Sequence, residues 1–143
     1  MKIAERLRSK GIDVDLDLVR AGALLHDVGR GKTHEISHGV VGADIARGLG
    51  LPESIIKIIE RHIGGGIPAD EAEDLGLPPK SYMPVSIEEK IVSYADKLVE
   101  RGREVDINVT LRHYQKDLGL EHPAVLRLQA LHEEMTELIE HEI

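Results

Sequence analysis

A nearly all-apolar helical stretch over residues 16–28 constrains the fold more than any other feature of the sequence. Its apolar side chains face almost every direction around a helix: Leu16, Leu18, Val19, Ala21, Ala23, Leu24 and Leu25. A helix of this kind has to be covered by other elements, so we expect it to be central and buried. Asp13 or Asp15 can cap its start, and the glycines at 29 and 31 end it.

The remaining apolar residues repeat at helical spacing, and no segment shows the alternation expected of a strand. Aromatic residues are scarce, with three Tyr and no Phe or Trp, so the core consists of Leu, Ile, Val and Ala. We therefore expect a compact all-α bundle of about six to seven helices, with a further short helix in a proline-rich loop. The expected ranges outside the central helix are 2–10, 38–48, 53–62, 69–75, 86–100, 106–118 and 122–143.

Length and charge limit the class of protein. The 143 residues correspond to one domain, with its core over about 16–100 and its C-terminal helices over about 106–143. No apolar run approaches the ~20 residues of a membrane span, and the first residues lack the apolar centre of a signal peptide. We therefore expect a cytoplasmic protein. The net charge of −8 argues against a nucleic-acid backbone as the main partner. The lack of Cys excludes disulfides, thiolate nucleophiles and cysteine zinc sites.

An imidazole and a carboxylate, His26 and Asp27, end the central apolar run. Burying an unpaired carboxylate is costly, and a divalent metal removes that cost by taking both side chains as ligands. The alternative is purely structural: a hydrogen-bonded His at a helix end beside an Asp that caps the next turn.

Three further candidates for metal ligands lie on other helices: His38, His62 and Asp96. A shell of imidazole and carboxylate suits Mn, Fe, Co, Ni, Mg or Zn. These positions converge only if the helices pack as a bundle, and the spacing alone leaves a metal site and a structural role equally open.

Two stretches carry a resemblance to a known family: ALLHDVGRGKTHEISHGVVGADIARGLGLPESIIKIIERHIG and EEKIVSYADKL. In this order they resemble the HD-domain superfamily of metal-dependent phosphohydrolases, in the subgroup whose central motif reads His-Asp-Ile/Val-Gly (HDIG). The resemblance runs from about Val19 to Val99. The Pro-Pro-Lys-x-Tyr-Met-Pro segment over 78–84 is similar to that of small archaeal predicted hydrolases of this type.

The resemblance implies an all-α HD fold and roles for individual residues. His26 and Asp27 would be the central metal ligands and catalytic residues, and Asp96 would close the same site. His38 and His62 match the ligands of a second metal, so the site would hold one or two divalent ions. Arg30 and Lys32 follow the motif, where a substrate phosphate could bind. We expect Lys97, which follows Asp96, to lie on the surface.

The implied activity is hydrolysis of a small phosphate ester, such as a nucleotide, by water activated at the metal. One departure favours an alternative: family members supply a further His from a preceding helix, and no His precedes His26. The alternative is a non-catalytic HD-fold protein that binds a metal or nucleotide for regulation. A third reading is a helical interaction module without metal. His34, a water or another protomer could replace the missing ligand, and an exposed side of the central helix would favour a homodimer.

Overall fold

The computed structural model describes residues 1–33 and 35–140. Its elements in chain order are α1 (Lys2–Ser9), α2 (Leu16–Leu25), the 3-10 helix η1 (Val28–Gly31), α3 (His38–Gly48), α4 (Glu53–Glu60), α5 (Ala69–Asp74), α6 (Ile87–Asp96), β1 (Val99–Glu100), β2 (Arg103–Glu104), α7 (Ile107–Leu118) and α8 (Pro123–Glu140). The expected all-α fold is confirmed. The described residues form eight α-helices, of which α5 has only six residues. None of these helices combines the length and hydropathy that a membrane span requires.

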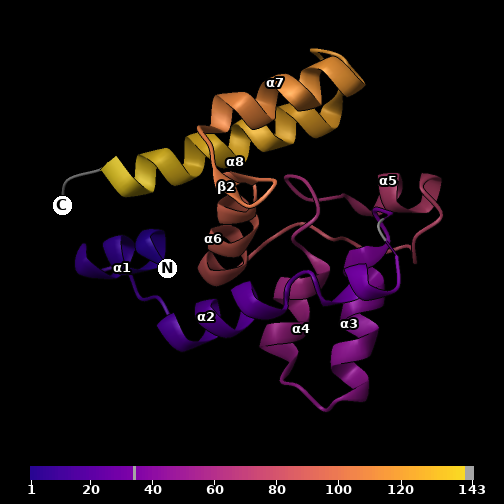
Figure 1. The fold of residues 1–143 in the computed structure, drawn as a ribbon, viewed down its shortest axis with the longest axis horizontal. Coiled ribbons are helices and arrows are strands. Elements are labelled where there is room, and N and C mark those ends of the chain that lie inside the picture. The colour runs from indigo at the N-terminus through magenta and orange to yellow at the C-terminus, as the bar shows by residue number, and fades with distance from the viewer. Residues whose placement is uncertain (34, 141–143) are drawn as a thin grey trace.

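The helices form two groups joined through α6. In Figure 1, α7 and α8 lie side by side above α6, and α3 and α4 form a helical pair below it. The largest core unites α1, α2, α6, α7 and α8 through buried residues such as Leu7, Val19, Ile91, Leu111 and Leu128. A second, smaller core lies between α3 and α4. The candidate site residues lie where these two groups meet.

The central helix is shorter and more exposed than the sequence predicts. It ends at Leu25, and only Val19 and Gly22 are fully buried within it. Gly22 allows α2 to pack closely against α4, because a Cβ at this position would lie 2.7 Å from the Ile58 side chain of α4. Leu24 points the other way and is 79% exposed. The prediction of a helix buried on all sides is therefore wrong, since α2 packs on α1, α4 and α6 but leaves residues such as Leu24 exposed.

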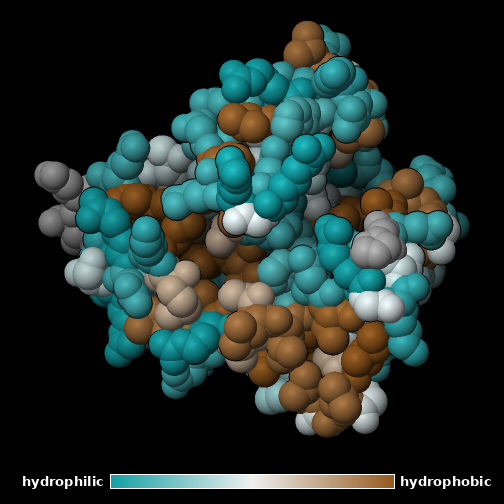
Figure 2. All heavy atoms as spheres, in the orientation of Figure 1, coloured by the Kyte–Doolittle hydropathy of each residue, from teal (hydrophilic) through white to brown (hydrophobic). Residues whose placement is uncertain are grey.

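A small apolar surface remains on this side of the protein. Leu24 and Leu49 are exposed, and Leu25, Leu51 and Ile55 are only partly buried. Figure 2 shows apolar side chains gathered over the lower end of the α3–α4 pair. A homodimer that covers this surface stays a prediction.

The expectation that the chain has no strands is wrong for one short segment. Helix α6 was expected to reach about residue 100, but it ends at Asp96 and a two-stranded hairpin of β1 and β2 follows. Arg101 and Gly102 connect the strands, and both have positive φ (51° and 77°), as the tight turns of hairpins require. Only the glycine signals such a turn, so the sequence gives a weak indication of it.

Candidate metal centre

The His26–Asp27 pair lies where α2 passes into η1. Asp15 caps the helix by accepting a hydrogen bond from the Leu18 amide (3.0 Å). At the other end, the His26 amide still donates to Gly22, and His26 Nδ1 donates to the carbonyl of Ala23 (2.7 Å). This second bond orients the imidazole, so that Nε2 faces the interior of the protein.

His38 and His62 are held in the same way from two other elements. His38, at the start of α3, donates from Nδ1 to the carbonyl of Glu35 (2.8 Å). His62, just after α4, donates from Nδ1 to the carbonyl of Ile59 (2.6 Å). Each of the three imidazoles therefore uses Nδ1 on a carbonyl three residues earlier, which leaves Nε2 to face the other residues of the site. Metal-ligating histidines are fixed by hydrogen bonds of this kind.

The three Nε2 atoms surround the carboxylate of Asp27. Their distances to its oxygens are 3.3 Å from His26, 3.4 Å from His38 and 3.3 Å from His62. The Nε2 atoms of His38 and His62 are themselves 3.0 Å apart. Because both nitrogens carry lone pairs in the neutral rings, only a proton or a metal ion between them makes this approach favourable. The donor atoms of His26, Asp27 and His62 all lie within 4.8 Å of one another, a spacing that fits a divalent ion.

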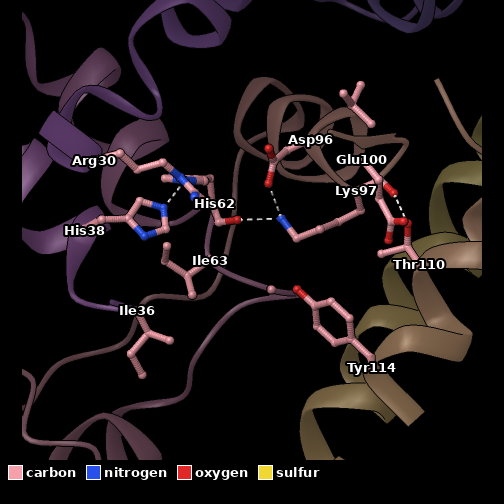
Figure 3. Close-up of a pocket in the computed structure, with 12 residues that line it drawn as sticks. Arg30, Ile36, His38, His62, Ile63, Asp96, Lys97, Glu100, Thr110 and Tyr114 are labelled. Carbon is pink, nitrogen blue, oxygen red and sulfur yellow. Dashed lines mark hydrogen bonds and ion pairs between the residues drawn. The ribbon is translucent and has the colours of Figure 1, made fainter. Parts of the chain in front are cut away.

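Asp96 joins the group from the end of α6. Its Oδ1 accepts from His26 Nε2 (3.1 Å), and its Oδ2 accepts from Lys97 Nζ (2.8 Å). The structure thus brings together all five predicted ligand positions, from α2, α3, α4 and α6. Figure 3 shows His38, His62 and Asp96 from these separate elements around one cavity.

The prediction that Lys97 lies on the surface is wrong. Lys97 is 5% exposed, and its ammonium also donates to the carbonyls of His62 (2.8 Å) and Ser93 (3.3 Å). The early end of α6 explains the difference, because Lys97 is the C-terminal cap of the helix and turns toward α4 instead of continuing the helical face. Figure 3 shows its ammonium between His62 and Asp96.

Both carboxylates remain ionised over the physiological range. The hydrogen bond with His62 holds the pKa of Asp27 well below its usual range and outweighs the opposing effect of burial. Burial alone would raise the pKa of Asp96, but His26 and Lys97 reverse its effect and lower that pKa strongly. Two anionic groups beside three imidazoles form a donor set suited to a cation.

The pKa values of His26 and His38 are shifted in opposite directions. Burial opposes the charged form of His26, but the hydrogen bond and charge of Asp96 prevail and raise its pKa. Burial lowers the pKa of His38, and the positive neighbours His62 and Arg30 add to this effect. His38 is therefore neutral at physiological pH and available as a ligand.

The predicted phosphate-binding residues have different positions. Arg30 donates from Nε to Asp27 Oδ1 (3.0 Å) and lines the cavity beside the site. Lys32 is exposed and is not among the residues lining this cavity. The predicted substitute ligand His34 lies outside the described residues.

The cavity has a volume of about 340 Å³ and a wall that the sequence did not indicate. Glu100, Thr110 and Tyr114 line it from the hairpin and α7. Burial raises the pKa of the Tyr114 phenol, which keeps it neutral and able to donate a hydrogen bond. These residues carry no motif, and only the packing of α7 against the end of α6 brings them to the site.

Comparison with known proteins identifies the family. The HD domain model matches residues 1–101. The chain belongs to the HD domain family. This confirms the resemblance seen in the sequence.

Several relatives match a longer part of this chain than the HD domain model does. An uncharacterized protein of Methanocaldococcus jannaschii is 48% identical over 138 residues, which cover 96% of this chain and 82% of the relative. A tRNA (cytidine(56)-2'-O)-methyltransferase of Picrophilus torridus is 45% identical over 138 residues, covering 96% of this chain but 39% of the relative. The enzyme of the same name from Thermoplasma volcanium is 44% identical over 131 residues, covering 92% of this chain and 38% of the relative. No solved structure matches the chain.

The chain therefore spans well under half of the two methyltransferases, and most of each enzyme lies outside the match. Their names refer to tRNA, whereas the expectation from the sequence is a small phosphorylated substrate and not a nucleic acid. The reaction named for these relatives is a methyl transfer and not a hydrolysis, so the family supports metal chemistry in this chain without deciding its reaction.

Proposed function

We propose that the protein is a metal-dependent phosphohydrolase whose metal site consists of His26, Asp27, His38, His62 and Asp96. The orientation of the three imidazoles carries this proposal. Each is fixed through Nδ1 so that Nε2 faces Asp27 within 3.3–3.4 Å. The Nε2 atoms of His38 and His62, 3.0 Å apart beside an ionised carboxylate, are donor atoms that a divalent ion could share.

A divalent ion in this site would act as a Lewis acid that lowers the pKa of water and offsets phosphoryl charge. The side chains of the protein supply the rest. Arg30 lies between Asp27 and the cavity, where its guanidinium can bind a phosphoryl oxygen. The carboxylate of Asp27 is 42% exposed and ionised, so it can orient the attacking water by accepting a hydrogen bond from it. The neutral phenol of Tyr114 can donate to the substrate from the opposite wall.

The non-catalytic alternative rests on the missing first His. Helix α1 precedes the His26 helix, but its sequence contains no His. A site that binds metal and catalyses no hydrolysis would have a regulatory role. The third reading, an interaction module without metal, predicts that these side chains have only protein partners.

A function connected with tRNA is a second candidate, because the relatives named as tRNA methyltransferases contain a region 44–45% identical to this chain. In that case the hydrolase would act on a product or intermediate of RNA processing. The net charge of −8 favours a small phosphorylated fragment over intact tRNA. A tRNA titration monitored by filter binding tests this candidate, and tight binding at physiological salt would favour intact tRNA.

Metal content and phosphatase activity together test the main proposal. We expect one or two Mn per chain by elemental analysis after loading, and Mn affinity lowered about 100-fold or more in Asp27→Ala, since even outer partners of ligands change affinity by 10–100-fold. Asp17→Ala is the matched control, because Asp17 lies on α2, the helix that precedes Asp27, with its side chain 94% exposed.

Each outcome distinguishes the alternatives. Hydrolysis of a phosphate monoester by wild type and not by Asp27→Ala supports the phosphohydrolase. Metal binding without hydrolysis of any phosphate ester supports the regulatory protein. Equal metal content in wild type and Asp27→Ala would show that the assignment of the site is wrong.

A further inference from the structure

A second, more apolar cavity opens directly from the candidate metal centre. It has a volume of about 550 Å³ and shares four lining residues with the first cavity: Ile36, Ile63, Gly64 and Tyr114. Beyond this shared part, its wall contains Ile67, Leu75, Leu118 and Ala124. Figure 3 shows Ile36 and Ile63 facing Tyr114 across the shared part, next to Asp96 and Lys97.

Close packing holds the two walls of this groove together. A Cβ on Gly65 would lie 2.7 Å from the Leu128 amide nitrogen, so the 64–67 loop lies directly against α8. Arg127 of α8 donates from Nε to the carbonyl of Gly66 (2.8 Å). The groove is therefore formed before any ligand binds, which reduces the entropy lost on binding.

The far wall of the groove lies outside the HD match. Tyr114 and Leu118 belong to α7 and Ala124 and Arg127 to α8, whereas the family match ends at residue 101. The groove thus lies between one wall within the matched domain and a second wall formed by residues that follow it.

Charge limits what this combined cleft can bind. Every Arg or Lys that lines either cavity already has a carboxylate partner: Arg30 with Asp27, Lys97 with Asp96 and Arg127 with Glu71. The groove also contains the acidic Asp74 and Asp117. A phosphate at the metal centre is compatible with these charges, but further phosphates in the groove would meet carboxylates and apolar side chains.

We propose that the substrate is a phosphate monoester of an alcohol that carries an aromatic or similarly apolar group, and that this group binds in the groove. The inference rests on the proposed function. In the reaction, the oxygen of one water forms a bond to phosphorus and the P–O bond to the alcohol breaks. The alcohol takes up a proton, and the other product is inorganic phosphate.

Binding of two non-hydrolysable phosphonates to the Mn-loaded protein tests this inference without relying on turnover. 1-Naphthylphosphonate and methylphosphonate share the phosphate-like group and differ in the apolar part. We expect calorimetry to give about 10-fold or more tighter binding of the naphthyl compound, from burial of its ring. Leu118→Glu should remove most of this preference and leave methylphosphonate binding unchanged.

Leu120→Glu is the matched control. Leu120 lies two residues further along the chain, is 70% exposed and does not line the groove, so its variant should retain the preference. Thermal unfolding of both variants verifies that they fold.

The possible results separate the inference from the proposed function. Equal affinity for the two phosphonates, or an equal loss of both in Leu118→Glu, would overturn the groove assignment while leaving the phosphohydrolase intact. If Mn binds and neither phosphonate does, both the groove assignment and the phosphohydrolase are wrong.

Discussion

Glu89 is a buried carboxylate of α6 that has a specific cationic partner. It is 6% exposed and accepts a hydrogen bond from Arg61 (2.7 Å) and from the Val85 amide (3.1 Å). Burial would raise the pKa of Glu89, but Arg61 and the other donors lower it below its ordinary value of 4.5. The folded state therefore gains stability above the unfolded pKa and loses it as the pH falls through the folded pKa.

Replacing Arg61 with Gln should change both the stability and its pH dependence. We expect a loss of about 3 kcal/mol at pH 7, because a buried carboxylate is left without its charge partner. Burial then raises the folded pKa of Glu89 in the variant, so its carboxyl becomes protonated at a higher pH than in wild type. The difference in the free energy of unfolding between wild type and variant therefore shrinks as the pH falls from about 7 to about 4.

Urea unfolding followed by far-UV circular dichroism at both pH values measures this effect. Arg20→Gln serves as the control, because Arg20 pairs with Asp17 at 3.5 Å on the exposed surface of α2. We expect it to change stability by less than about 1 kcal/mol. A pH-independent loss in Arg61→Gln would contradict the role of Glu89.

At the scale of single residues, the sequence predicted which side chains with recognisable chemistry come together in the candidate site. His26, His38, His62 and Asp96 converge with Asp27 as the resemblance implied. The sequence did not reveal Lys97 and Tyr114 as parts of the site wall, since their positions depend on where α6 ends and on how α7 packs. Such positions follow from tertiary contacts and not from local patterns.

At the scale of elements, the contact between η1 and α3 depends on a glycine. A Cβ on Gly29 would lie 2.0 Å from the carbonyl oxygen of His38 and 2.7 Å from the Gly42 amide nitrogen. Both neighbours are backbone atoms that cannot move aside. This close approach places Asp27 and His38 next to each other, so the glycine of the His-Asp-Val-Gly sequence has a structural role in the site.

Gly29→Ala should therefore destabilise the protein by about 3 kcal/mol or more and weaken Mn binding, because α3 has to move away from η1. Gly31→Ala is the control on the same short helix, since a Cβ there would meet no atom within 4 Å. Thermal unfolding and Mn titration of the two variants provide the measurement. Similar behaviour of both variants would show that the close approach is not required.

Helix positions were predictable where periodicity and end signals agree. Helix α3 begins at His38 and ends at Gly48, as expected, and Ser86 caps α6 by accepting from the Glu89 amide (3.1 Å). The predictions failed at the ends of α2 and α6. There, 3-10 and hairpin turns replace regular helix, and apolar residues such as Val99 continue the helical pattern after the helix has stopped.

At the scale of the whole molecule, the main core extends across the end of the family match. Residues before 101, including Leu7 and Ile91, pack with residues of α7 and α8 in one cluster. The buried apolar residues that the two last helices contribute are Ile107, Leu111, Val125, Leu128, Leu131 and Met135. The HD region is therefore not an independent unit in this chain.

A protein that ends after Glu104 should lose cooperative folding. Each of the buried side chains it lacks contributes about 2 kcal/mol, so together they match the full stability of a typical domain. We expect a broad urea transition by circular dichroism and binding of a hydrophobic dye. A sharp transition like that of the full chain would show that residues 1–104 fold without α7 and α8.

The position of α7 and α8 also has a consequence for how proteins of this kind diverge. The proposed metal ligands lie on or just after α2, α3, α4 and α6, whereas the outer wall of the apolar groove lies on the last two helices. Substitutions on the groove-facing side of those helices can therefore alter which molecule is recognised while the ligand set stays intact. On the two proposals made above, the chemistry and part of the selectivity are encoded in different segments of one gene, so descendants can inherit the first unchanged and acquire a new version of the second.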